Sequence, residues 1–88
     1  MNVEEVQSAV ATVINRVLTD SGRPAKTIQP DDTLTGTLGL DSLDLAVLVV
    51  GLEQSLGVDP FRTGAQPVRS VEELVELYRS ALAAKDGA

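Results

Sequence analysis

The chain lacks cysteine, histidine and tryptophan, and these absences narrow the chemistry that its 88 residues can perform. Without cysteine it forms no disulfide and offers no thiolate to a metal ion. Without histidine it cannot build a Ser-His-Asp triad, a Cys-His pair or a histidine-ligated zinc site. A serine–lysine pair needs Lys26 or Lys85, which we expect in a loop and in the C-terminal tail. The sequence therefore predicts a protein without catalytic activity or a metal site.

Basic residues are also scarce, with 7 Lys and Arg against 13 Asp and Glu and a net charge of −6. The segment from Asp41 to Leu56 has acidic residues and no basic residue. An acidic surface repels phosphate backbones, so we expect no nucleic-acid partner and no helix-turn-helix function. Basic partner surfaces are the natural expectation, although a modest negative charge can also serve solubility alone.

Long apolar runs are missing as well. None approaches the roughly 18 residues needed to cross a bilayer, and no basic segment followed by an apolar core opens the chain. We therefore expect a cytoplasmic protein that does not engage membranes. Its length suits one small domain, which we place at residues 1–88.

The first predicted helix begins near Val3 and ends near Thr19. Asn2 and Glu5 have the spacing of a capping box at its start. Apolar residues recur every three or four positions and so share one face. They are Val3, Val6, Val10, Val13, Ile14 and Val17.

Residues 20–40 form a long connection rich in Asp, Thr, Gly and Pro. Loops of this length are uncommon in small domains and usually have a role. A passive crossover between two helices is an equal alternative at this point. We expect the loop to be pinned to the core by Ile28, Leu34, Leu38 and Leu40.

The second helix is predicted from Ser42 to Leu56, with Gly57 as a left-handed stop. At about 100° per residue its apolar residues form two stripes on roughly opposite sides. One stripe consists of Leu45, Leu48, Val49, Leu52 and Leu56, and the other of Leu43, Ala46, Val47 and Val50. Such a helix is either buried all round or keeps one face for a partner. Few elements remain in 88 residues to cover it, which favours the partner face.

Two further helices complete an all-α, four-helix bundle with a short third helix. Asp59 and Pro60 are start signals for the third helix, which Gly64 limits to a turn or two. The last helix is expected to begin at Ser70, with Glu73 completing a second capping box, and to give way to a polar tail from Ala84. Its inward residues are predicted to be Val71, Leu74, Val75, Tyr78 and Leu82.

Ser42 stands at the entrance of the second helix, where serine is an ordinary N-cap contributing about 1 kcal/mol. Asp41 can fill the same role through its own carboxylate. If Asp41 is the cap, the Ser42 hydroxyl is free for modification, beside the unpaired amides of a helix start. Local spacing leaves both readings open.

The segment Leu38-Gly39-Leu40-Asp41-Ser42-Leu43 resembles the attachment motif of the acyl carrier protein family. The resemblance spans nearly the whole chain. It includes the valine-rich first helix, the long loop, the helix ending in Leu52-Glu53-x-x-Leu56-Gly57-Val58, and the last helix opening on Ser70-Val71-Glu72-Glu73-Leu74. It implies that Ser42 carries 4′-phosphopantetheine, added from coenzyme A by a phosphopantetheinyl transferase. The thiol that the chain lacks would thus be imported.

The resemblance also implies partners and sites. Acyl-loading and acyl-processing enzymes would dock on the second helix, with candidates Asp41, Leu43, Asp44, Val47, Val50 and Glu53. An acyl chain would lie between the second and third helices, with candidates Leu48, Leu52, Phe61 and Leu74, each of which is otherwise plain core. Fatty-acid carriers often have acids where this chain has Val47, Gln54 and Ser55, and this difference indicates a more apolar docking surface.

We therefore interpret the sequence as a stand-alone, monomeric acyl carrier protein of a fatty-acid, polyketide or specialised pathway. One alternative is a small helical interaction module that docks through the second stripe, with Ser42 as a simple cap. Another is a peptidyl carrier, although Gly39-Leu40 replaces the Gly-Gly typical of that class. The cargo is left open.

Overall fold

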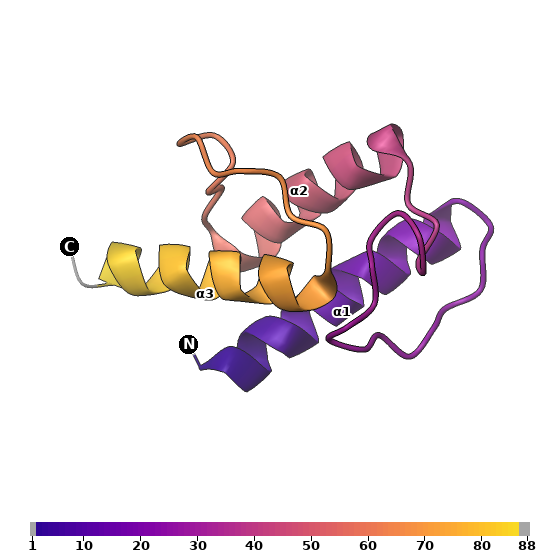
Figure 1. The fold of residues 1–88 in the computed structure, drawn as a ribbon, viewed down its shortest axis with the longest axis horizontal. Coiled ribbons are helices and arrows are strands. Elements are labelled where there is room, and N and C mark those ends of the chain that lie inside the picture. The colour runs from indigo at the N-terminus through magenta and orange to yellow at the C-terminus, as the bar shows by residue number, and fades with distance from the viewer. Residues whose placement is uncertain (1, 87–88) are drawn as a thin grey trace.

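The computed structural model describes residues 2–86, which contain three helices and no β-strand. These are α1 (Val3–Asp20), α2 (Ser42–Leu56) and α3 (Val71–Asp86). In Figure 1 the end of α1 and the start of α2 lie at the same end of the molecule. The long connection between them loops around that end. The predicted all-α class is confirmed, but the four-helix bundle is not.

The first two helices begin and end as predicted. Asn2 accepts a hydrogen bond from the Glu5 amide at 2.9 Å, and the Glu5 carboxylate accepts one from the Asn2 amide, which completes the capping box. At the end of α2, Gly57 has a φ of 77° and donates its amide to the Glu53 carbonyl at 2.8 Å. Only a residue that tolerates a left-handed conformation stops a helix in this way.

The predicted third helix is not formed, and residues 60–64 instead make successive turns. Backbone amides donate to carbonyls three residues earlier, from Arg62 to Asp59 at 3.2 Å and from Thr63 to Pro60 at 3.3 Å. Gly64, with a φ of 101°, then turns the chain away. A start signal and a stop signal so close together leave too few residues to offset helix nucleation.

The last helix begins one residue later than predicted, at Val71, and extends beyond Ala84 to Asp86. Ser70 accepts the Glu73 amide at 3.2 Å, but the Glu73 carboxylate faces the Ser70 hydroxyl rather than its amide. Only half of the expected capping box is therefore present. Residues 87–88 of the predicted tail lie outside the described part of the chain.

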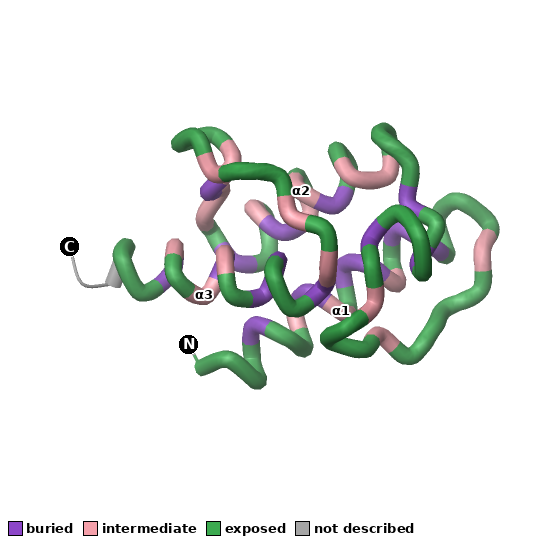
Figure 2. Tube along the Cα trace, in the orientation of Figure 1, coloured by how far each residue is buried: buried purple, intermediate pink, exposed green. Residues whose placement is uncertain are grey.

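The core lies where α1 packs against both α2 and α3. The inward residues predicted for α1 and α3 are buried, except Val3, which is 42% exposed because it precedes the region that the other helices cover. From the long loop, Leu34, Leu38 and Leu40 are buried and Ile28 packs partly against them. Figure 2 shows these buried stretches on all three helices and on the loop that leads into α2. The loop is thus part of the core, as predicted.

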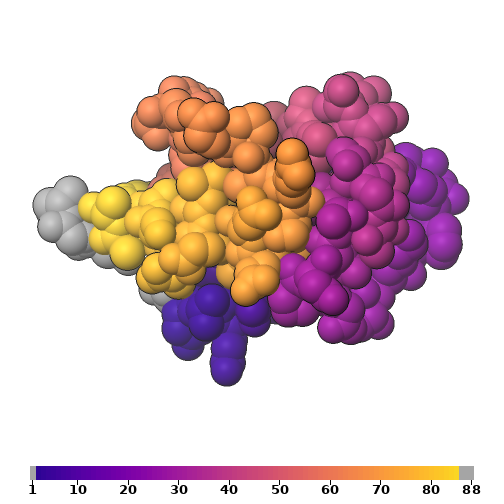
Figure 3. Space-filling view, viewed as in Figure 1, coloured from indigo at the N-terminus to yellow at the C-terminus, as the bar shows by residue number. Residues whose placement is uncertain are grey.

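The loop is also tied to the start of α3. The Leu34 amide donates to the Arg69 carbonyl at 2.8 Å, and the Val71 amide donates to the Asp32 carbonyl at 2.9 Å. Figure 3 shows the two segments meeting on one face of the molecule, the loop in magenta and the start of α3 in orange. None of the helices within residues 2–86 has the length and hydropathy that a membrane span requires.

Candidate functional site

Ser42 is the first residue of α2, and its side chain is exposed. The cap is Asp41, whose carboxylate accepts the Asp44 amide at 2.8 Å, while the Asp44 carboxylate accepts the Asp41 amide at 3.1 Å. This reciprocal capping box satisfies the helix start without the serine hydroxyl. The interpretation of Ser42 as a cap is therefore wrong, and its hydroxyl is presented at the surface.

The segment before Ser42 is fixed by two buried leucines. Leu38 and Leu40 are each 2% exposed, and the Leu40 amide donates to the Leu34 carbonyl at 3.0 Å. Gly39 lies between them with a φ of 69°, a conformation that other residues rarely adopt. Because Leu38 and Leu40 are packed in the core, the chain reaches the surface again at Asp41 and Ser42.

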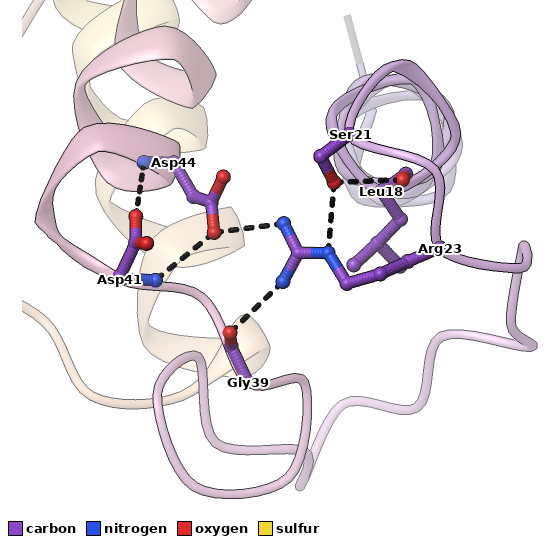
Figure 4. Close-up of polar contacts among 6 residues, drawn as sticks. All are labelled: Leu18, Ser21, Arg23, Gly39, Asp41 and Asp44. Atoms are coloured by element: carbon purple, nitrogen blue, oxygen red, sulfur yellow. Dashed lines mark hydrogen bonds and ion pairs between the residues drawn. The ribbon is translucent and has the colours of Figure 1, made fainter.

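Arg23, which the sequence did not single out, joins this segment to the end of α1 (Figure 4). Its Nη1 donates to the Gly39 carbonyl at 2.9 Å, and its Nη2 donates to Asp44 Oδ2 at 2.8 Å. Its Nε donates to the Ser21 hydroxyl at 2.8 Å, which in turn donates to the Leu18 carbonyl. Arginine in a long loop gives no sequence signal for a partner 21 positions away.

Asp44 is consequently occupied within the chain. The Asp41 backbone amide, and after it the Arg23 guanidinium, hold the pKa of the Asp44 carboxyl below its usual range. Its side chain is only 14% exposed. Asp44 was predicted to face partner enzymes; within the chain it closes the capping box of α2 and pairs with Arg23.

The outer face of α2 carries the most exposed large apolar side chains of the described residues. Leu43 is 73% exposed, Val47 49% and Val50 55%, and Ala46 between them is also exposed. Glu53, further along the helix, pairs with Arg62 at 3.0 Å. The second stripe predicted from the sequence is therefore exposed, and its neighbouring carboxylate has a partner within the chain.

A cavity of about 170 Å³ lies between α2, the turns at residues 60–64 and the start of α3. Three of the four predicted acyl-pocket residues line it, namely Leu48, Phe61 and Leu74. Leu52 does not line the cavity and is fully buried elsewhere in the core. The sequence missed the other lining residues, which are Leu34, Leu45, Val49, Pro67 and Val68. Those from the two loops carry no periodic signal that could have found them.

The family model that matches this chain and the related proteins that resemble it agree with one another. Residues 5–78 match the family model described as a phosphopantetheine attachment site. The acyl carrier protein of Solidesulfovibrio magneticus is 31% identical over 68 residues, covering 76% of this chain and 87% of that protein. The acyl carrier protein of Acidothermus cellulolyticus is 34% identical over 58 residues, covering 66% of each chain. Acyl carrier protein 1, chloroplastic, of Casuarina glauca is 36% identical over 64 residues, covering 66% of this chain and 47% of that protein. No solved structure matches at comparable significance.

Proposed function

This chain belongs to the acyl carrier protein family, and we propose that Ser42 is the residue that carries its prosthetic group. Members of the family bear a covalently attached 4′-phosphopantetheine and interact with a phosphopantetheinyl transferase and with acyl-processing enzymes. As a rule they are carriers and not catalysts. The observation that supports Ser42 is its exposed position at the start of α2. Asp41 caps this helix, so the serine hydroxyl is not needed as a cap.

The residues around Ser42 fit the group. The hydroxyl is accessible to a modifying enzyme, and the helix start beside it favours negative charge such as that of a phosphodiester. In the reaction, Ser42 Oγ bonds to the phosphorus next to pantetheine in coenzyme A, and the phosphoanhydride bond breaks. Adenosine 3′,5′-bisphosphate leaves, and the serine proton passes to a base of the transferase. Once attached, the group supplies the thiol that holds acyl chains as thioesters.

Partner enzymes dock, in this proposal, on the outer face of α2 that follows Ser42. Leu43, Val47 and Val50 form an apolar patch there, while Asp44 and Glu53 are each held by an arginine of the chain. A partner meeting this patch gains by burying apolar area rather than by pairing charges. This apolar mode of docking favours a dedicated biosynthetic pathway over a fatty-acid synthase whose enzymes recognise an acidic helix.

The cavity behind α2 is proposed to receive part of the acyl chain. Its surroundings are almost wholly apolar, with Leu48, Phe61 and Leu74 among the lining residues. A volume of about 170 Å³ accommodates a short acyl chain and not a long one unless the walls move. The wall segment that contributes Pro67 and Val68 makes no backbone hydrogen bond at residues 66–68 within the described part of the chain, so it is the natural part to yield.

The proposal is tested by intact-protein mass after incubation with coenzyme A, Mg²⁺ and a broad-specificity phosphopantetheinyl transferase. We expect wild type to gain one phosphopantetheine group and Ser42→Ala to gain none. Ser55→Ala, which changes an exposed serine of the same helix, is the matched control and should be modified like wild type. Absence of modification in folded wild-type protein across several transferases would favour the alternative of an interaction module.

A further inference from the structure

Within residues 2–86, Arg23 is the one side chain whose hydrogen bonds link the end of α1 to both sides of Ser42. It binds the carbonyl of Gly39, three residues before the serine, and the carboxylate of Asp44, two residues after it. Its third contact, to Ser21, is itself anchored on the Leu18 carbonyl in the last turn of α1. Figure 4 shows the Arg23 guanidinium between the end of α1 and the segment that leads into α2.

The geometry of these contacts distinguishes Arg23 from an ordinary surface ion pair. Exposed pairs typically contribute little, because two long side chains must be ordered to make them. The Arg23 side chain is only 32% exposed, and all three of its nitrogens are engaged. A planar guanidinium held at three points fixes the relative positions of its partners, which a lysine ammonium cannot do in the same way.

On the premise that Ser42 is the attachment site, we propose that Arg23 is a positioning residue for its modification. By holding Gly39 and Asp44 together, it fixes the backbone from residue 39 to the first turn of α2. The serine hydroxyl is then presented in one orientation to the transferase. A bound loop also spares the transferase the free energy of ordering it on docking.

Arg23 has a second effect through charge. Asp41 and Asp44 flank Ser42 with two carboxylates, which oppose the addition of a phosphodiester at that position. The helix has no basic residue of its own between Asp41 and Leu56. The guanidinium from the preceding loop compensates Asp44, so the positive end of α2 remains available to a phosphate.

The test compares Arg23→Gln and Arg23→Lys with wild type in the transferase reaction, at varied carrier concentration. Arg79→Gln is the matched control, because Arg79 pairs with Glu76 three residues away on α3 at 2.6 Å and touches no element near Ser42. We expect Arg23→Gln to lower kcat/KM about tenfold, the size of one charge-assisted bond. Arg23→Lys should recover part of the loss, and Arg79→Gln should match wild type.

A second readout needs no enzyme. Amide hydrogen exchange of the unmodified protein reports whether Asp41 and Asp44, whose amides close the capping box, are held as in wild type. We expect both amides to exchange at least several-fold faster in Arg23→Gln, with core amides of α1 and α3 unchanged. This separates a local loosening from a general loss of stability.

The outcomes are distinct. Wild type that is never modified contradicts the proposed function, whatever the exchange rates show. Arg23→Gln with wild-type kinetics overturns the positioning role while leaving Ser42 as the attachment site. Slow transfer with unchanged exchange at Asp41 and Asp44 also overturns it, since Arg23 would then act by touching the transferase. If Arg23→Gln does not fold, the same comparisons are made with Arg23→Lys.

Discussion

The two faces of α2 are made of the same kinds of residue and have opposite fates. On the inner face Leu48, Leu52 and Leu56 are at most 7% exposed. On the outer face Leu43, Val47 and Val50 are between 49% and 73% exposed. Hydrophobicity therefore does not decide which side of this helix is buried. The neighbours do, because α1, α3 and the long loop cover only one side.

The exposed face is maintained against a physical cost. Contiguous apolar patches on a small protein promote unwanted association and usually mark a site of interaction. The chain has too few elements to wrap the helix completely, as expected at this size. The inner face of α2 therefore stabilises the fold, and the outer face is left exposed to partners. The following changes test that division.

The largest effect is expected on the inner face. Leu52→Ala removes a fully buried side chain and should lower the free energy of unfolding by about 2–5 kcal/mol, through lost burial and a cavity. Chemical denaturation measures it. A loss in the free energy of unfolding below about 1 kcal/mol would mean that the inner face of α2 is not tightly packed in the core.

A change at the boundary between the faces should have an intermediate effect. A Cβ at Gly51 would lie 2.7 Å from Val13 Cγ1 of α1, closer than side chains can approach. Gly51→Ala should therefore destabilise the protein by about 1–2 kcal/mol, although alanine is the better helix former. In a Val13→Ala background the same change should become neutral or stabilising. Destabilisation of equal size in both backgrounds would rule out the close packing of α1 on α2 as its cause.

A smaller effect on stability is expected on the outer face. Leu43→Ser should change the free energy of unfolding by less than about 0.5 kcal/mol, because the side chain is already exposed. The same variant should slow phosphopantetheine transfer, since the partner loses apolar contact next to Ser42. Val3→Ser, an exposed apolar residue on α1, is the control and should affect neither quantity. Transfer rates equal to wild type in Leu43→Ser would remove Leu43 from the docking surface.

The burial of Tyr78 in the core can also be tested by pH titration. No change in stability from this residue is expected near neutral pH. Burial raises the pKa of Tyr78 to about 12, with further contributions from Asp59 and Glu53. The folded pKa lies above the unfolded value, so the native state keeps its proton longer. The resulting stability is complete below pH 10 and is lost as the pH rises toward 12. Because Tyr78 is the only tyrosine and no tryptophan is present, its ultraviolet titration is unobscured. A midpoint near 10 in folded protein would contradict its burial.

The sequence predicted most of the fold because its signals are local. The capping box at Asn2, the left-handed stop at Gly57 and the periodicity of each long helix involve residues within one or two turns of one another. The same holds for the two stripes of α2 and for the buried leucines of the loop. The short third helix was predicted wrongly, because start and stop signals were present but the residues between them were too few for a helix.

At the candidate site, the motif around Ser42, the availability of Asp41 as a cap and the lack of histidine and cysteine can all be seen in the sequence. The other features of the site depend on how the chain packs. The tertiary structure engages Asp44 with Arg23, excludes Leu52 from the cavity and adds loop residues to the cavity wall. The physical reason is separation along the chain. Hydrogen bonds and packing between residues some 20 positions apart depend on where the loop and helices meet, and no local pattern encodes that meeting.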